Sequence, residues 1–574
     1  MRTRWRRILW PRWARRPVRR FARAPLGRLV RHFLDKMVRG GQDQSSELDL
    51  GAGALLGFLA APGAFTSLLM LDKYSALLNW FRGHLRDDLY VTSVPDKYLF
   101  LCVAMAVTGI VTALKWDQLL PDPQDYLNLA PLPVRPRRIL LANALAILVA
   151  VAIISVDVSA VPAVLFPGFV MAAARSTFTA FAQFAVIHIF CVVLASVFSI
   201  ASVFTILGTA SAVLPRATFR AWSAWLRGAL LLAFLALLLS GFAGASLTDR
   251  LHSESPIRFL PSMWFLALYQ QLQHRATPVL EPMARWALAG LASSIVAAAV
   301  ACTASYRRSF ASTLEGGPAP SRQHALAAIL WVLDAFAPRR AGFARAAHRF
   351  AVRALLRSET HRLTIAVALG LGGMAALQDN FGASLGCGFL LLLGLRVAFE
   401  IPAGVPANWI FRAILDTRTN ETQPIARRVM LSFLVPLVLA PCMAVAWLAI
   451  GPVYAVGHTA FVLALSVAVI ELLLNGYRKV PLTCPMPGFR DHFLMLCLIQ
   501  FVGYEVFTRA GAAMETWMWA APWRFALVPL AMAWAWHWNR GRLAEAREAG
   551  EVEEGLTFEN VSAPAVTRMD LSGG

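Results

Sequence analysis

Long, continuous runs of apolar residues, separated by shorter polar segments, dominate the pattern along the chain. A helix needs roughly 17–25 such residues to cross a bilayer, and about twelve runs approach that length. Because the runs are continuous and do not alternate, they predict α-helices rather than the strands of a membrane barrel. The predicted spans are residues 50–71, 98–114, 139–155, 178–207, 228–247, 285–304, 363–377, 385–401, 429–450, 456–474, 493–508 and 520–538.

The third predicted span is short, and a further apolar run at 158–173 could continue it. The expected fold is therefore all-α: a polytopic transmembrane helical bundle of about twelve spans, arranged as two six-helix halves. The corresponding divisions are a basic tail at 1–49, a first half at 50–304, a central cytoplasmic loop at 305–362, a second half at 363–538 and a tail at 539–574.

Basic residues are distributed asymmetrically between the loops. With the N-terminus in the cytoplasm, 42 of the 54 Lys and Arg residues fall on cytoplasmic segments and 9 on outer loops. Cytoplasmic loops of membrane proteins collect Lys and Arg, so this bias sets the orientation. We expect an integral protein of the cytoplasmic (inner) membrane with both termini in the cytoplasm.

Three shorter segments carry apolar residues without being long enough to span. Residues 26–37 combine an apolar face with a basic face, and this pattern predicts an amphipathic helix on an anionic leaflet. Residues 256–273 contain prolines and aromatic residues and are expected to dip into the membrane interface and return. Residues 325–337, in the central loop, are expected to form a surface or docking helix.

Composition narrows the class further. Hydrophobic residues make up 58% of the 574 residues and charged residues only 15%, which excludes a soluble enzyme and a disordered protein. The net charge of +21 is explained by the cytoplasmic loops, so no nucleic-acid partner is expected. The seven cysteines include no C-x-x-C pair, and we predict neither a metal site nor a disulfide framework. No cofactor is expected.

The search for catalytic motifs gives no support for an enzyme. The chain has no Gly-Lys pair and so no phosphate-binding loop of its own. We assign neither a zinc-peptidase motif nor a serine-hydrolase motif, and expect a protein that is not itself an enzyme.

Five ionisable residues fall within or near predicted spans, where such groups are expensive and often functional: His188, Arg396, Glu400, Glu471 and Glu505. Each has a structural alternative. Arg396 and Glu400 are four residues apart, so they share a helix face and can pair near a cytoplasmic end. A lone histidine such as His188 is more often a packed, hydrogen-bonded residue than a proton carrier.

Two predicted cytoplasmic loops share one plan. The first, after the second span, has acidic residues, a Pro-Leu-Pro kink and a basic re-entry; its candidate coupling residues are Asp122, Asp125, Leu132 and Pro133. The second, after the eighth span, combines prolines with an aromatic helix; its candidates are Asn408, Trp409, Phe411 and Arg412. Matching loops in each half favour an internal duplication.

The pattern D-x-x-x-L-x-x-L-P-V-x-x-R-x-I, at 125–139, resembles permease subunits of ATP-binding-cassette (ABC) exporters. The segments RSETHR (357–362), GLRVAFEIPAGVPANWIFR (394–412), KVPLTCPMPG (479–488) and GLTFE (555–559) resemble bacterial membrane proteins grouped with those permeases. The resemblance implies a transmembrane exporter subunit, with the eight loop residues contacting a separate cytoplasmic ATPase. Those permeases usually have six spans per subunit, whereas this chain has about twelve predicted spans.

Two alternatives to the exporter remain open. One is an integral membrane enzyme acting on a lipid-linked substrate, for which Glu471, Glu505 and His492 are the nearest candidate residues. The other is a membrane scaffold or assembly factor that transports nothing.

Overall fold

The fold is known from a computed structural model, in which every described element is a helix and no strand occurs among the described residues. The described residues are 25–39, 52–74, 93–119, 136–173, 177–242, 259–275, 280–314, 330–339, 342–378, 382–403, 422–475, 477, 480–483, 493–527 and 530. The chain divides into two compact units, Met1–Pro320 and Ser321–Gly574.

Seven helices are long and apolar enough to cross a membrane, which establishes a helical protein with membrane-spanning character. They are Val94–Leu114, Arg138–Met171, Phe178–Val213, Trp222–Phe242, Glu281–Arg308, Thr422–Ala449 and Pro452–Leu473. A further apolar helix, Ala383–Ala398, is shorter. The full set of twelve spans and the two-halves arrangement stay predictions.

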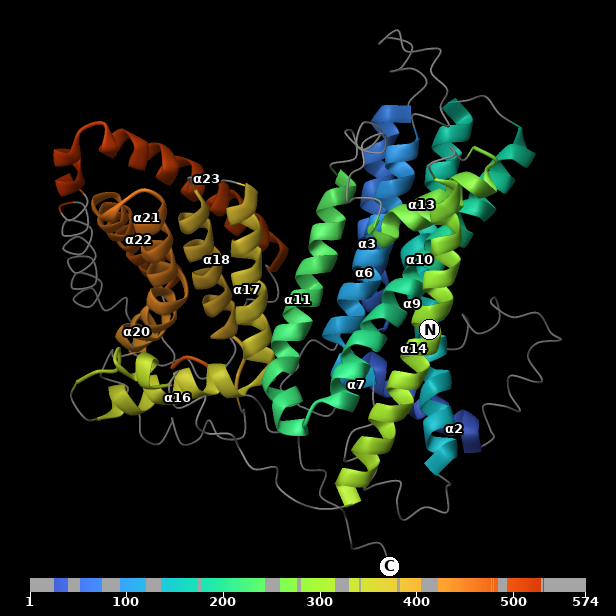
Figure 1. The fold of residues 1–574 in the computed structure, drawn as a ribbon, viewed down its shortest axis with the longest axis horizontal. Helices are drawn as coiled ribbons and strands as arrows, with labels where there is room; N and C mark the ends of the chain where they lie inside the picture. The colour runs from blue at the N-terminus through green and yellow to red at the C-terminus, as the bar shows by residue number, and fades with distance from the viewer. Residues whose placement is uncertain are drawn as a thin grey trace, which may run out of the picture. The chain divides into compact units, whose positions relative to one another are not determined.

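The first unit is a bundle of long helices (Figure 1). Its elements are α2 (Pro25–Arg39), α3 (Ala52–Tyr74), α6 (Val94–Leu114), α7 (Trp116–Leu119), α9 (Pro136–Ala173), α10 (Phe178–Val213), α11 (Arg216–Phe242), α13 (Pro261–Leu272) and α14 (Glu281–Leu314). Helix α10 packs against α14, α6, α9 and α13 and forms the centre of the unit. The predicted third span and the run at 158–173 form one continuous helix, α9.

Helix α13 lies within the segment 256–273, for which the entry into the membrane interface stays a prediction. Its side chains are buried inside the unit, against α14, α10 and α6, and Met263, Phe265 and Tyr269 have no exposed surface. A helix that is apolar around its circumference buries all of its faces, and at 12 residues α13 is too short to span. It therefore belongs to the core.

Helix α2 forms where the amphipathic pattern predicts a helix, but its apolar face is covered by protein. Val30, Phe33 and Met37 are buried in one cluster with Ile139 and Ala142 of α9. The basic face remains exposed, so its contact with anionic lipid stays a prediction.

The second unit contains α16 (Phe343–Arg357), α17 (Glu359–Gln378), α18 (Ala383–Ala398), α20 (Thr422–Leu434), α21 (Ala440–Ala449), α22 (Pro452–Leu473) and α23 (Phe493–Trp519). Helix α18 lies at its centre and contacts α17, α20, α22 and α23. In Figure 1, α16 runs along one end of this unit and α23 runs across the opposite end.

One span of the second unit is interrupted by a π-helical turn. Val435–Leu439 forms this turn between α20 and α21, and Pro436 lies within it. Proline has no N–H for the helical ladder, and a π-turn is a common way for a helix to continue past such a disruption.

The predicted docking helix at 325–337 is described only from residue 330, where residues 330–334 are helical. Leu333 is buried with Val352 and Leu355 of α16, and Asp334 pairs with Arg349 at 3.2 Å. This short helix therefore docks on α16, which lies within the predicted central loop.

Candidate functional site

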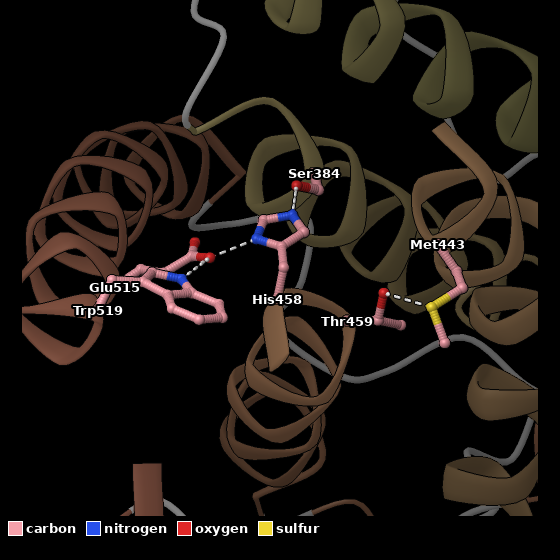
Figure 2. A network of polar contacts seen from close by, with 6 residues as sticks. All are labelled: Ser384, Met443, His458, Thr459, Glu515 and Trp519. Carbon is pink, nitrogen blue, oxygen red and sulfur yellow. Dashed lines mark hydrogen bonds and ion pairs between the residues drawn. The ribbon is translucent and has the colours of Figure 1, made fainter. Parts of the chain in front are cut away.

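Three polar side chains from three helices meet in the second unit (Figure 2). The Ser384 hydroxyl lies 2.6 Å from Nε2 of His458, and Nδ1 of the same ring lies 2.5 Å from Oε1 of Glu515. The imidazole is thus held between a hydroxyl on one side and a carboxylate on the other, with both ring nitrogens in contact.

The packing of α23 brings the carboxylate to the histidine. Ser384 is in the first turn of α18, His458 is in the second turn of α22, and Glu515 is near the end of α23. Close contact is possible because glycine faces α23: a Cβ added at Gly386 would lie 3.1 Å from the Tyr504 hydroxyl. The crossing of α23 over α18 and α22 therefore sets the geometry of the site.

Aromatic side chains form one wall of the site. The Tyr454 ring stacks on His458 with a centroid distance of 5.5 Å and on Trp519 at 4.9 Å. The indole Nε1–H of Trp519 donates to Oε1 of Glu515 at 3.3 Å. Gly457 makes room for the indole, because an added Cβ would lie 2.9 Å from a ring carbon of Trp519. The carboxylate is therefore held from two sides.

The protonation pattern follows from the partners. A carboxylate is acceptor-only when ionised, so Nδ1–H of His458 donates to Glu515. In the neutral imidazole Nε2 is then the acceptor, and the Ser384 hydroxyl donates to it. Ser384 is partly exposed, whereas His458 and Glu515 are 6% and 4% exposed. The Ser384 hydroxyl is thus the most accessible of the three groups, and the imidazole and the carboxylate behind it are buried.

The sequence around Ser384 corrects our motif assignment. Residues 382–386 read G-A-S-L-G, which fits the serine-hydrolase pattern G-x-S-x-G, so the prediction that the chain has no such motif is wrong. In α/β-hydrolases the pattern lies on a strand–turn–helix. Here Gly382 precedes α18, and the serine is the second residue of that helix. The local signal was available, but nothing in the sequence pointed to His458 or Glu515 as its partners.

The intramembrane residues singled out from the sequence have other contacts among the described residues. His188 is fully buried in α10, where Nδ1 lies 3.3 Å from the Tyr269 hydroxyl. Arg396 pairs with Glu400, and its Nε–H also donates to the carbonyl of Leu473 at 2.9 Å. These contacts fit structural roles.

The two remaining glutamates are also paired. Glu471 accepts from Arg427 at 2.5 Å, and Glu505 accepts from Arg509 at 2.9 Å within one helix. His492 and all eight candidate coupling residues, at 122–133 and 408–412, lie outside the described residues.

The first unit contains a polar cluster that the sequence analysis did not identify. The buried Asp96 accepts from Lys73 at 2.7 Å and from Tyr74, while the buried Lys97 donates to Gln273 at 2.7 Å. The Lys97 ammonium also lies 5.4 Å from the Tyr269 ring centroid. These contacts hold two opposite charges within the core of the first unit.

Comparison with known proteins finds no matching family, no matching curated protein and no matching solved structure. No group of His, Cys, Asp and Glu residues suited to a metal ion occurs in the described part of the chain.

Proposed function

We propose that the chain is an integral membrane hydrolase or acyltransferase that uses Ser384 as its nucleophile. The supporting observation is the Ser384–His458–Glu515 arrangement, in which Nε2 and Nδ1 of one imidazole meet a hydroxyl and a carboxylate. The proposal is a form of the membrane-enzyme alternative, but it places the chemistry on Ser384, His458 and Glu515 and not on Glu471, Glu505 and His492.

The chemistry follows from the roles of these groups. As the Ser384 oxygen attacks a substrate carbonyl, its proton passes to Nε2 of His458. Collapse of the tetrahedral intermediate transfers that proton to the leaving alcohol or amine and leaves an acyl group on Ser384. A water or an acceptor alcohol then attacks the acyl-enzyme, and its proton again passes to Nε2, which returns it to the serine oxygen.

Two features support the charged intermediates. Glu515 stabilises the imidazolium that forms when His458 takes the proton. The start of α18 has backbone N–H groups without acceptors in the same helix, and the positive end of a helix dipole favours a developing oxyanion. Ser384 lies in that first turn.

The depth of the site indicates the substrate class. His458 is six residues from the start of the candidate span Pro452–Leu473, or about 9 Å along the helix. That depth corresponds to the boundary between headgroups and acyl chains, so an ester or amide carbonyl of a lipid-linked molecule could reach Ser384. The basic-residue asymmetry predicts that this is the outer boundary.

A fluorophosphonate probe tests the proposal, because it phosphonylates a serine activated by a neighbouring base. Full-length protein in detergent should be labelled at Ser384, and Ser384→Ala should abolish labelling. Ser432→Ala is the matched control: this buried serine of α20 donates only to the Val429 carbonyl. Absence of labelling in folded wild-type protein, or labelling that persists in Ser384→Ala, would overturn the proposal.

The exporter function stays a separate prediction from the resemblance, because its coupling residues lie outside the described residues. A pull-down with a candidate cytoplasmic ABC ATPase would test it. Leu132→Ala combined with Phe411→Ala should release that ATPase, since truncating an interface anchor typically costs about 2 kcal/mol or more. Undiminished binding would contradict the coupling assignment.

A further inference from the structure

Four arginines form a stripe along α16. Arg345, Arg349, Arg353 and Arg357 recur at every fourth residue, so each is displaced by only about 40° around the helix from the one before. The stripe is about 18 Å long, from 12 intervals of about 1.5 Å. A single face of this helix therefore carries four positive charges.

The opposite face of α16 is buried, and this keeps the arginine stripe on the surface. Ala351, Val352 and Leu355 are fully buried in the core of the second unit, and Ala347 packs with Ile425 of α20. Because α16 cannot rotate without exposing these residues, its arginines are held on the surface.

The stripe has positive charge beyond its internal pairing. Arg345 donates to the carbonyls of Pro338 and Arg339, and Arg349 pairs with Asp334 at 3.2 Å. Arg353 and Arg357 are exposed and have no acidic partner within the described ranges. Two guanidinium groups thus face outward unneutralised.

The arginines line a hollow of 610 Å³ along this face, together with smaller and apolar residues. The other lining residues are Gly342, Ala346, Phe350 and Ala354. A surface that alternates guanidinium groups with apolar patches suits an amphiphile, whose phosphate meets the charges and whose chains meet the apolar atoms.

The position of α16 places the stripe at headgroup depth. Helix α16 packs on α20, which begins the candidate span Thr422–Ala449, and Figure 1 shows it running along one end of the unit. The end of a spanning helix lies in the interfacial layer of the bilayer. The orientation predicted from the basic residues makes this the cytoplasmic leaflet, which is rich in anionic lipid.

We propose that the arginine face of α16 binds the phosphate groups of anionic phospholipids. Guanidinium groups bind phosphate through two parallel N–H···O bonds, and this geometry distinguishes them from lysine. Neighbouring arginines are about 6 Å apart along the helix. Two of them can therefore bind one phosphate together, or each can bind the phosphate of one of two adjacent headgroups. This site is independent of the serine chemistry proposed above.

The test uses full-length protein in a neutral detergent, titrated with phosphatidylglycerol or phosphatidylcholine while thermal unfolding is followed. Phosphatidylglycerol should raise the unfolding temperature saturably and phosphatidylcholine should not. Arg353→Gln with Arg357→Gln should weaken the apparent phosphatidylglycerol affinity by about 30-fold, and the effect should diminish in high salt. Arg353→Lys with Arg357→Lys should lose less, because the charge is kept and the bidentate contact is lost.

The matched control removes two exposed charges elsewhere, with Arg285→Gln and Arg509→Gln, and should keep wild-type affinity. Unchanged affinity in the double Gln variant would overturn the proposal. Glycerol phosphate that stabilises the protein at the same concentration as the lipid would also overturn it, by showing a site for a free anion. If the Gln variant does not fold, the Lys variant and the wild-type comparison of the two lipids still decide.

Discussion

Each unit of the molecule buries a histidine within a candidate span, and the two environments differ. In the first unit, His188 touches the Tyr269 hydroxyl through Nδ1, and its ring packs against Phe100 and Phe166. In the second, His458 has a hydroxyl on one nitrogen and a carboxylate on the other. Both rings are buried. Only His458 lies beside a hydroxyl that can give it a proton and a carboxylate that would stabilise its protonated form.

The difference shows that burial of an ionisable residue in a membrane helix is a weak indicator of function. The neighbours decide whether the group can exchange a proton. In the first unit those neighbours are aromatic rings, which stabilise by packing, and the Tyr269 hydroxyl. In the second they are matched donors and acceptors.

The largest expected effect contrasts the two histidines directly. His458→Ala should lower the rate of fluorophosphonate labelling at Ser384 by at least about 10³-fold, because the serine loses its base. His188→Ala should leave that rate within about twofold but destabilise the protein by about 2–4 kcal/mol, because it leaves a cavity. Labelling rates and denaturant unfolding measure the two quantities; equal loss of labelling in both variants would break the comparison.

Glu515→Gln should have the next largest effect. A glutamine can donate its amide N–H to Nδ1, which favours the tautomer with the proton on Nε2 and removes the acceptor for the serine proton. We expect labelling to slow by about 10³-fold or somewhat less, with little change in unfolding temperature. Glu505→Gln, on the same helix but paired with exposed Arg509, should label normally. A normal rate in Glu515→Gln would contradict the role of the carboxylate.

Gly457→Ala should give a smaller effect, transmitted through Trp519. The new Cβ would lie 2.9 Å from the indole, so the ring that holds Glu515 must shift, at a cost of about 1–3 kcal/mol. Labelling should slow by about tenfold, since about 1.4 kcal/mol corresponds to that factor. Gly373→Ala, which would meet no atom within 4 Å, should label normally and gain about 0.5–1 kcal/mol of stability from better helix propensity.

The smallest expected effect is a pH dependence outside the spans. There the described histidines of the first unit, His32 and His274, are exposed, whereas His348 and His361 of the second are buried. Burial lowers the pKa of both buried rings below the usual 6.5, and His361 in addition contacts the Ile401 carbonyl at 2.9 Å. The native state then binds fewer protons than the unfolded state in mild acid.

Stability contributed by these rings should therefore be complete above about pH 6.5 and should decline as the pH falls below it. Unfolding temperatures measured between pH 7.5 and 5.5 should fall, and His361→Gln should flatten part of that fall. An unfolding temperature that rises toward pH 5.5 and is unaffected by His361→Gln would contradict this assignment.

The helical class and several candidate spans were predictable because a long apolar run is the direct requirement for a helix that crosses the hydrocarbon core of a bilayer. Helix α9 shows the limit of that signal. Asp157 separates the span predicted at 139–155 from the run at 158–173 that could continue it, and the helix does run through Asp157, Pro162 and Pro167 to Ala173. A single polar residue or proline can be accommodated within a long helix by its neighbours, and those neighbours are not adjacent in sequence.

The candidate site was less predictable. Ser384 lies in a recognisable motif, but His458 is 74 residues further along the chain and Glu515 is 57 beyond that. Glu505 and Glu515 are both on α23 and differ by ten residues, which places them on different faces of the helix. Only the packing of α23 on α18 and α22 shows which carboxylate is buried, and no periodicity within α23 itself decides that.

At the π-helical turn Val435–Leu439, the number of residues sets the rotation of α21 relative to α20, whereas the identity of the exposed residues has less effect. An α-helix advances by about 100° per residue, so deleting one residue of the turn would rotate all of α21 by about that angle relative to α20. Met443, whose sulfur accepts from the Thr459 hydroxyl at 3.5 Å, would then point elsewhere (Figure 2). Substitutions at exposed Leu437 should be tolerated, whereas single-residue insertions or deletions in the turn should misalign α21 against α22.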